Sequence, residues 1–309
     1  MKKFIATLAT IVVALGSAFA QDLAAVTELY NSGAEAISTD KAGALKSFEA
    51  ALSLADALGE EGQEIVANCK NIIPNLRLSL AKDLVKASQF DEAIAALQEL
   101  EKVAEAYEAL DVLNEATTLI PQVKMSKANN LYKAKEYDAA AAAFQEILDA
   151  EPTNGNAAFY KGAALVGAGK NAEAIAAFEL AAANGQEANA NKQIGNLYLK
   201  EAANALKAKK YADAVTAAAK VNDYTENAQA WQIAGQASQA AGKNNDAIKY
   251  FEKSLAAAPD ASNAGAIAYT VGALYQQAKN NAKAKEFYTK AASDPKYGAE
   301  AKKMLDALK

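Results

Sequence analysis

Apolar residues recur along this chain with the spacing of amphipathic helices. In the stretches AAFYKGAALVGAG (157–169) and NAEAIAAFELAAANG (171–185) they stand at positions i, i+3, i+4 and i+7, which places them on one face of a helix. Few β-branched runs interrupt these stretches, and residues that favour helices, such as Ala, Leu, Glu and Lys, dominate them. The pattern predicts an all-α protein built from successive helices.

The same arrangement returns at intervals of 33 to 49 residues. The copies align on one alanine, namely Ala44, Ala93, Ala140, Ala174, Ala214, Ala247 and Ala284, the first two fitting more loosely. Four positions later stand Phe48, Leu97, Phe144, Phe178, Ala218, Phe251 and Tyr288. Twelve positions earlier stand Ser32, Ala81, Ala128, Gly162, Ala202, Gly235 and Gly272. Five aromatic residues at one position exceed what the chain's 22 Phe and Tyr residues would give by chance, so the repeat is real.

Each copy predicts a pair of helices. Gly169 and Gly242 follow the first helix, where a left-handed cap is expected, and an Asn or Asp begins the second. A small residue such as Gly162 or Gly235 lets the two helices approach closely, and the aromatic residue of the second helix fills the space against the neighbouring unit. One hairpin cannot bury its apolar face alone, so the hairpins must stack.

The five prolines all fall at the ends of these units. Pro152, Pro259 and Pro295 close a unit, whereas Pro74 and Pro121 open one. A proline that opens a unit either starts a helix at its first turn or kinks a longer one, and the sequence leaves both alternatives open.

The units resemble tetratricopeptide repeats, a family of 34-residue helix hairpins. The copy at about 228–261 carries the family pattern in Trp231, Gly235, Ala247, Phe251 and Pro259. The resemblance implies a right-handed α-α superhelix (a solenoid) of about seven helix hairpins. We expect irregular hairpins with long helices over 21–120, regular repeats over 121–296 and a C-terminal capping helix over 297–309.

Residues 1–20, MKKFIATLATIVVALGSAFA, follow a different pattern. Two lysines, an apolar stretch and a final Ala-Phe-Ala are typical of a secretory signal peptide, so we expect cleavage after Ala20 and a periplasmic or secreted protein. Gln21 stands where a lipid-anchored protein would have a cysteine. No later segment reaches about 18 uninterrupted apolar residues, so we expect no transmembrane segment in the mature chain.

Composition narrows the chemistry. Without its first two lysines the chain has 30 Lys and Arg against 37 Asp and Glu, a net charge of −7, and no basic stripe of the kind that nucleic acid requires. It has no histidine, and Cys69, its only cysteine, lies on the apolar side of a predicted helix. These features exclude Ser-His-Asp and Cys-His nucleophile systems and most zinc sites. We therefore expect neither an enzyme nor a cofactor or metal.

In the family that the repeats resemble, the first helices of successive hairpins line a concave groove for partner peptides. By position this implies ten candidate groove residues: Asn129, Tyr132, Phe159, Tyr160, Gln232, Gln236, Gln239, Tyr269, Gln276 and Gln277. The glutamines at 232, 236 and 239 form one stripe of one helix, either as a solvated face or as amides that suit a peptide backbone or the hydroxyls of a sugar. Trp231 matches a packing position and is predicted to lie in the core.

The resemblance implies a non-catalytic scaffold that binds a protein or peptide partner in the cell envelope. The family's clamp for chaperone C-termini is absent, because Met125 stands where its first lysine should be. The alternative is a binding module for glycan or another small ligand in nutrient uptake. The sequence leaves open the identity of the partner, the choice between peptide and glycan, and the oligomeric state.

Overall fold

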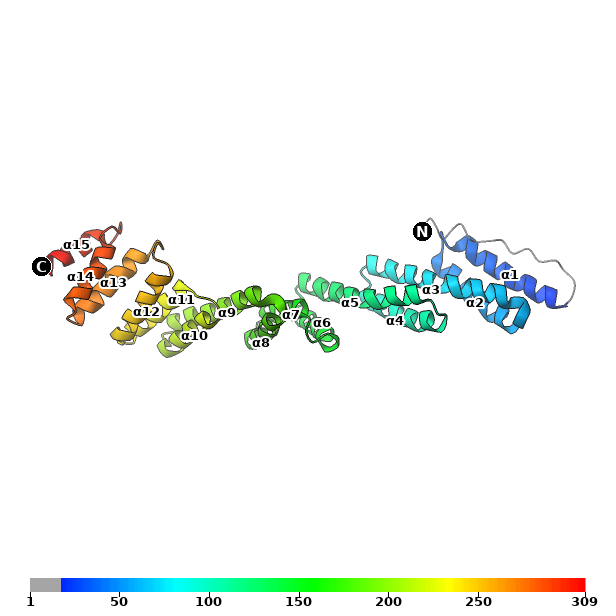
Figure 1. Ribbon diagram of the computed structural model, residues 1–309, viewed down its shortest axis with the longest axis horizontal. Coiled ribbons are helices and arrows are strands. Elements are labelled where there is room, and N and C mark those ends of the chain that lie inside the picture. Colours follow the sequence, from blue (N-terminus) through cyan, green and yellow to red (C-terminus); the bar gives the residue numbers. More distant parts are fainter. Residues whose placement is uncertain (1–17, 309) are drawn as a thin grey trace. The chain divides into compact units, whose positions relative to one another are not determined.

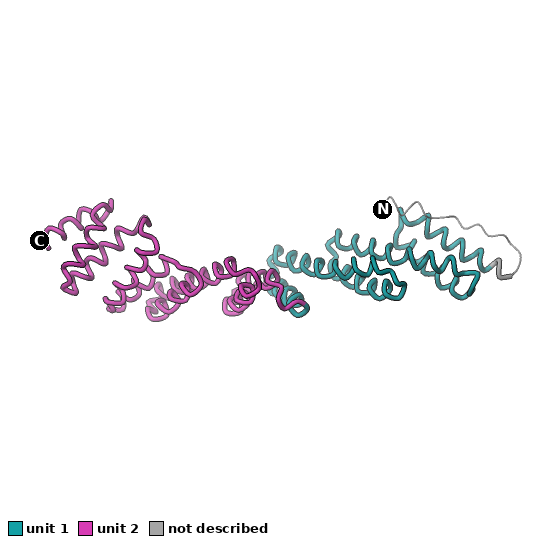
Figure 2. The backbone as a smooth tube through the Cα atoms, in the orientation of Figure 1, with its two compact units in different colours: residues 1–150 teal, residues 151–309 magenta. Residues whose placement is uncertain are grey.

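The structure, a computed structural model, describes residues 18–308, and every regular element among them is helical (Figure 1). Most of the predicted signal peptide therefore lies outside the described residues. The chain divides into two compact units, residues 1–150 and 151–309 (Figure 2). No helix of the described part has both the length and the apolar character needed to span a bilayer.

Unit 1 contains three antiparallel hairpins that follow one another along the chain. Their helices are α1 (Ala18–Ala36), α2 (Lys41–Ala57), α3 (Gln63–Lys86), α4 (Phe90–Ala106), α5 (Leu110–Lys133) and α6 (Tyr137–Ala150). A short 3-10 turn, Gly59–Gly62, joins α2 to α3. Each helix packs against the next, so the hairpins α1–α2, α3–α4 and α5–α6 stack as the repeat pattern predicts.

Unit 2 contains four hairpins and a final helix. Its elements are α7 (Gly155–Gly167), α8 (Asn171–Ala181), a π-helical turn (Ala182–Gln186), α9 (Glu187–Lys207), α10 (Tyr211–Tyr224), α11 (Ala228–Ala240), α12 (Asn244–Ala257), α13 (Ala264–Gln277), α14 (Asn281–Ala291) and α15 (Gly298–Ala307). The last helix packs on α14 and closes the array. The predicted all-α fold, with seven hairpins and a C-terminal helix, is confirmed for residues 18–308.

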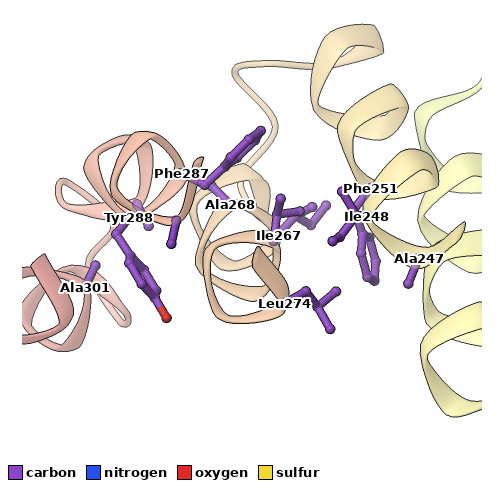
Figure 3. Close-up of a cluster of buried hydrophobic side chains, with 12 residues drawn as sticks. Ala247, Ile248, Phe251, Ile267, Ala268, Leu274, Phe287, Tyr288 and Ala301 are labelled. Carbon is purple, nitrogen blue, oxygen red and sulfur yellow. The ribbon is translucent and has the colours of Figure 1, made fainter. Parts of the chain in front are cut away.

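The repeated pair of a small residue and an aromatic residue is the contact inside a hairpin. A Cβ atom added to Gly162 would lie 2.7 Å from the ring of Phe178, and one added to Gly235 would lie 2.6 Å from the ring of Phe251. The last hairpin repeats this contact, with a Cβ atom on Gly272 lying 2.8 Å from the ring of Tyr288. Figure 3 shows the apolar side chains buried around α12–α15.

The first hairpin departs from the predicted register by one residue. The position that faces Phe48 is the buried Gly33, whereas Ser32 is exposed, so the alignment of Ser32 with the other small residues was wrong. The reason lies in the connection. Residues 37–40 join α1 to α2 without a left-handed residue, whereas the three-residue connection from α3 to α4 contains one at Ser88.

The left-handed caps predicted at Gly169 and Gly242 are confirmed by φ angles of +78° and +76°. After Gly169, the N–H of the next residue donates to the carbonyl of Leu165 at 2.9 Å, which closes the helix end. The equivalent residue of other hairpins is not glycine but is also left-handed, with φ between +59° and +63° at Ser88, Lys135, Lys209 and Lys279. No glycine marks these four positions, so the sequence pattern did not predict them.

Pro74 and Pro121 neither start nor end a helix. Each is the twelfth residue of a 24-residue helix, α3 and α5 respectively, and both helices continue through the proline. Helix α5 therefore also runs across residue 120, where we placed the end of the N-terminal region. The division into irregular hairpins over 21–120 and regular repeats over 121–296 describes the sequence pattern, and it stays a prediction.

Cys69 is fully buried in α3, as predicted. Burial raises the pKa of its thiol to about 12, so the thiolate form is suppressed at neutral pH.

Candidate functional site

All ten candidate residues lie on the first helices of hairpins. Two belong to unit 1, Asn129 and Tyr132 on α5, and eight belong to unit 2, on α7, α11 and α13. In unit 2, α9 packs directly against α11, whereas hollows of about 770, 240 and 790 Å³ separate α8 from α10, α10 from α12, and α12 from α14. The first helices α9 and α11 are therefore in contact, whereas hollows lie between the successive second helices of this unit.

In unit 1 the two candidates are half-buried. The ring of Tyr132 lies 5.8 Å from the ring of Tyr137, edge to face, across the turn from α5 to α6. Asn129 lies one turn before Tyr132 on the same helix. Most of Tyr132's ring contact is therefore made within its own hairpin.

The α7 candidates differ in exposure. Phe159 is half-buried and packs its ring 5.4 Å from that of Phe178 in α8. Tyr160, whose ring lies 5.7 Å from that of Phe159, is 40% exposed. Phe159 therefore packs within the hairpin, whereas Tyr160 contributes to the exposed surface of α7.

The glutamine stripe of α11 divides in the same way. The side-chain oxygen of Gln232 accepts a hydrogen bond of 2.8 Å from the amide of Asn263, just before α13. Gln236 and Gln239 are exposed, and neither makes a side-chain hydrogen bond among the described residues. Two of the three amides thus remain available to a ligand.

The α13 candidates serve mainly the packing of the last hairpin. The buried Tyr288 donates its hydroxyl proton to Gln276 at 2.7 Å, and its ring lies 5.5 Å from that of Tyr269. Tyr269 also stacks on Tyr297 at 5.4 Å. Gln277 is exposed and accepts a hydrogen bond of 3.3 Å from Asn244. Burial, and then the neighbouring Tyr269, raise the pKa of the Tyr288 hydroxyl.

Trp231 is half-buried at the contact between α11 and α12. Its ring stacks on Tyr250 at 5.8 Å, and the ammonium of Lys253 lies 4.1 Å from the ring centre. These contacts make it a packing residue, but it lies half-buried at the contact between two helices and not in the core, where its position in the repeat had predicted it.

None of the ten candidates lines the three hollows between second helices. The hollow of about 770 Å³, here called the lysine hollow, lies between α8, α9 and α10 and has Lys200, Lys210 and Lys220 at its edge. Within it, Lys220 lies 4.9 Å from the ring centre of Tyr198. The repeat pattern did not predict this hollow, although the 40-residue spacing from Ala174 to Ala214 indicates the extra length of α9.

Beside the lysine hollow, Tyr198 stacks on Tyr224 at 6.1 Å. Tyr224 donates a hydrogen bond of 2.6 Å to the carboxylate of Glu179, which, together with burial, raises the pKa of the Tyr224 hydroxyl to about 12. These contacts tie α10 to α8 and α9 next to the hollow.

Four carboxylates line the hollow of about 790 Å³ between α12 and α14, and three of them, Glu252, Glu286 and Asp294, already have partners. Glu252 accepts a hydrogen bond from the hydroxyl of Tyr275 at 2.8 Å, and Asp294 accepts bonds from two backbone N–H groups that follow it. Lys283 and Lys290 hold the pKa of Glu286 down to about 2. These three carboxylates thus serve the fold.

The two units carry opposite charge. Residues 22–150 contain 11 Lys and Arg against 22 Asp and Glu, a net charge of −11. Residues 151–309 contain 19 against 15, a net charge of +4. The net charge of the whole chain conceals this difference.

Comparison with protein families supports the repeat assignment. Residues 125–189 match the tetratricopeptide repeat model. The matched segment contains the aligned Ala128, Ala140, Phe144, Gly162 and Phe178. A comparison with curated protein sequences finds no match.

Solved structures of tetratricopeptide repeat proteins resemble the chain at low identity. The crystal structure of MamA protein is 18% identical, with a TM-score of 0.35, and the match covers 58% of this chain and 94% of that one. YrrB, described as a TPR protein with an unusual peptide-binding site, is 22% identical, with a TM-score of 0.33 and coverage of 59% and 91%. The C-terminal part of a TPR repeat-containing protein from Cytophaga hutchinsonii is 19% identical, with a TM-score of 0.37 and coverage of 75% and 84%. Because all three TM-scores lie below 0.5, nothing about the ligands of those proteins is transferred to this chain.

Proposed function

We propose that this protein is a non-catalytic scaffold of the bacterial cell envelope that binds a peptide or helix of a partner protein along its first helices. The observation that carries the proposal is the pair of exposed amides on α11, Gln236 and Gln239, which have no hydrogen-bond partner among the described residues. Each amide offers donors and an acceptor, which suits the N–H and C=O groups of a bound peptide. The envelope location rests on the signal-peptide pattern of residues 1–20.

Only some of the ten candidates can be tested for binding without disturbing the fold. Phe159, Tyr269 and Gln276 are engaged in packing, so their replacement would perturb the hairpins as well as any ligand. Gln236 and Gln239 are exposed and can be replaced without removing a side-chain hydrogen bond among the described residues. They are therefore the residues on which binding and folding can be separated.

The test is photo-crosslinking in cells with a crosslinking amino acid at position 236 or 239. We expect one dominant protein adduct in the envelope fraction, which an added Q236A or Q239A substitution at the other position weakens while the melting temperature is unchanged. The control carries the crosslinker at Lys249 of α12, an exposed residue of a second helix. Equal adduct formation from position 249, or none from 236 and 239, contradicts binding on the first helices.

A glycan in place of a peptide is the other outcome that this surface allows. It would appear as a rise in melting temperature of the purified protein with one member of a glycan panel, and no protein adduct in cells. The envelope location is tested separately by N-terminal sequencing of the cellular protein, which we expect to begin at Gln21.

A further inference from the structure

The turn between α4 and α5 presents an apolar side chain among unpaired carboxylates. Leu110 is 65% exposed, more than any other large hydrophobic residue of the described chain. Glu105, Glu108 and Asp111 around it are exposed, and none of them forms an ion pair among the described residues. Residues 105–111, here called the acidic turn, contain no basic residue and carry a net charge of −3.

The lysine hollow of unit 2 has the complementary character. Its lining includes the half-buried apolar side chains of Ile175 and Leu197, beneath an edge with Lys200 and Lys210. These two lysines form no ion pair within residues 18–308. The lining carries Lys200, Lys210 and Lys220 together with Glu201 and Asp213, a net charge of +1, and the neighbouring Lys207 and Lys209 bring residues 200–220 to a net charge of +3.

We propose that this protein associates with itself head to tail, the acidic turn of one copy inserting Leu110 into the lysine hollow of a second copy. Burial of the leucine among apolar side chains provides attraction that does not depend on salt. The charges of −3 on the acidic turn and +3 on residues 200–220 orient the two copies and accelerate their encounter. Because the two surfaces differ, the contact is heterologous, and copies add one after another unless the rotation closes a ring.

A second copy is the occupant that the charge distribution favours. The acidic turn belongs to residues 22–150, with a net charge of −11, and the hollow belongs to residues 151–309, with a net charge of +4. Each copy therefore offers one surface of each sign at equal concentration. The proposal does not rest on the function proposed above, since neither the acidic turn nor the lysine hollow contains any of the ten groove candidates.

The first measurement is sedimentation velocity of the full mature chain over a range of protein concentrations. We expect the weight-average mass to rise with concentration at about 0.05 M salt and the association to weaken at least tenfold at about 0.5 M salt, where charges are screened over a few Å. A mass that stays monomeric at every concentration overturns the proposal. A compact form whose amount does not depend on concentration also overturns it, because that result means docking within one chain.

Charge exchange supplies the second measurement. One variant carries E105K, E108K and D111K, and the other carries K200E, K210E and K220E. The backbone of Glu108 is left-handed, and Lys135, Lys209 and Lys279 adopt the same conformation, so the first variant keeps the turn. We expect each variant to be monomeric alone and an equal mixture of the two to associate, because every turn then meets a hollow of opposite charge.

Matched controls make the same change in charge elsewhere. D56K, E60K and E61K alter exposed residues near the α2–α3 turn, and K192E, K249E and K302E alter exposed lysines of unit 2. We expect both control variants to associate as the wild type does, and L110S to weaken association at every salt concentration. Association that survives both charge exchanges, or that the controls abolish equally, overturns the proposal.

Discussion

Gly235 lies against the ring of Phe251, so the effect of G235A on the free energy of unfolding should depend on whether that ring is present. In G235A the new Cβ atom would stand 2.6 Å from a ring carbon of Phe251, closer than real Cβ atoms approach, so the ring or α11 must move. Overpacking of a buried contact costs about 1 to 3 kcal/mol. Replacing glycine by alanine inside a helix gains about 1 kcal/mol. We expect G235A to lower the free energy of unfolding by about 1 kcal/mol, as the balance of these two effects.

The effect of G235A on stability should change from destabilising to stabilising when the ring of Phe251 is removed. F251A leaves a cavity at a side chain that is 3% exposed and costs about 3 to 5 kcal/mol by itself. In that background the Cβ atom meets no ring, so G235A should stabilise by about 1 kcal/mol, a coupling of about 2 kcal/mol between the two sites. The hairpin α9–α10 already carries this combination, with Ala202 and Ala218 at the two positions.

The assay is urea unfolding of the four proteins of this cycle, followed by far-ultraviolet circular dichroism. Because stacked hairpins can unfold in steps, the slopes of the transitions must agree before the free energies are compared. A G235A variant that is more stable than the wild type while Phe251 is present would refute the packing argument. Equal effects of G235A in both backgrounds would do the same.

Three further predictions follow from single residues. K279G should raise the free energy of unfolding by about 1 kcal/mol, and G242K should lower it by a similar amount, because only glycine adopts the left-handed conformation without strain. Urea unfolding measures both, and no change in either variant contradicts this reasoning. Cys69, with its pKa raised to about 12, should react with a thiol reagent at pH 8 only as fast as the fold opens, so rapid labelling of native protein contradicts its burial. The pKa of Glu286 is lowered to about 2, so its contribution is present above the usual carboxyl pKa and is lost as pH falls through about 2; E286Q should flatten acid unfolding in that window, and an unchanged profile contradicts the ion pairs.

The repeat pattern predicted the hairpins because it records their contacts directly. Gly162 and Gly235 are glycine since a side chain there would meet the aromatic ring of the second helix, and that pairing is visible as a fixed spacing. Where the connection changes, the spacing fails, as it does for Ser32 and Gly33. Pro74 could not be assigned from sequence, because a proline is tolerated inside a long helix only when packing on neighbouring helices holds that helix together.

The candidate site was predictable in position but not in availability. The register of the repeat places Tyr269 and Gln276 on a first helix, and the structure agrees. In the structure Gln276 is hydrogen-bonded to Tyr288, and Tyr269 stacks on Tyr297, which follows α14. These partners lie outside α13, so the spacing of residues within one helix could not predict the contacts. The lysine hollow was not predicted for a similar reason, because it depends on how neighbouring helices of different length pack, here the 11 residues of α8 and the 21 residues of α9.

The two proposed surfaces can act at the same time because they share no residue. Gln236 and Gln239 lie on α11, whereas the lysine hollow is lined by residues of α8, α9 and α10 and by none of α11. Docking of a second copy would therefore leave the glutamine stripe exposed. An assembled chain of copies would present that stripe repeatedly, so a partner with several binding segments would be held more tightly than by one copy, without any additional contact within each copy.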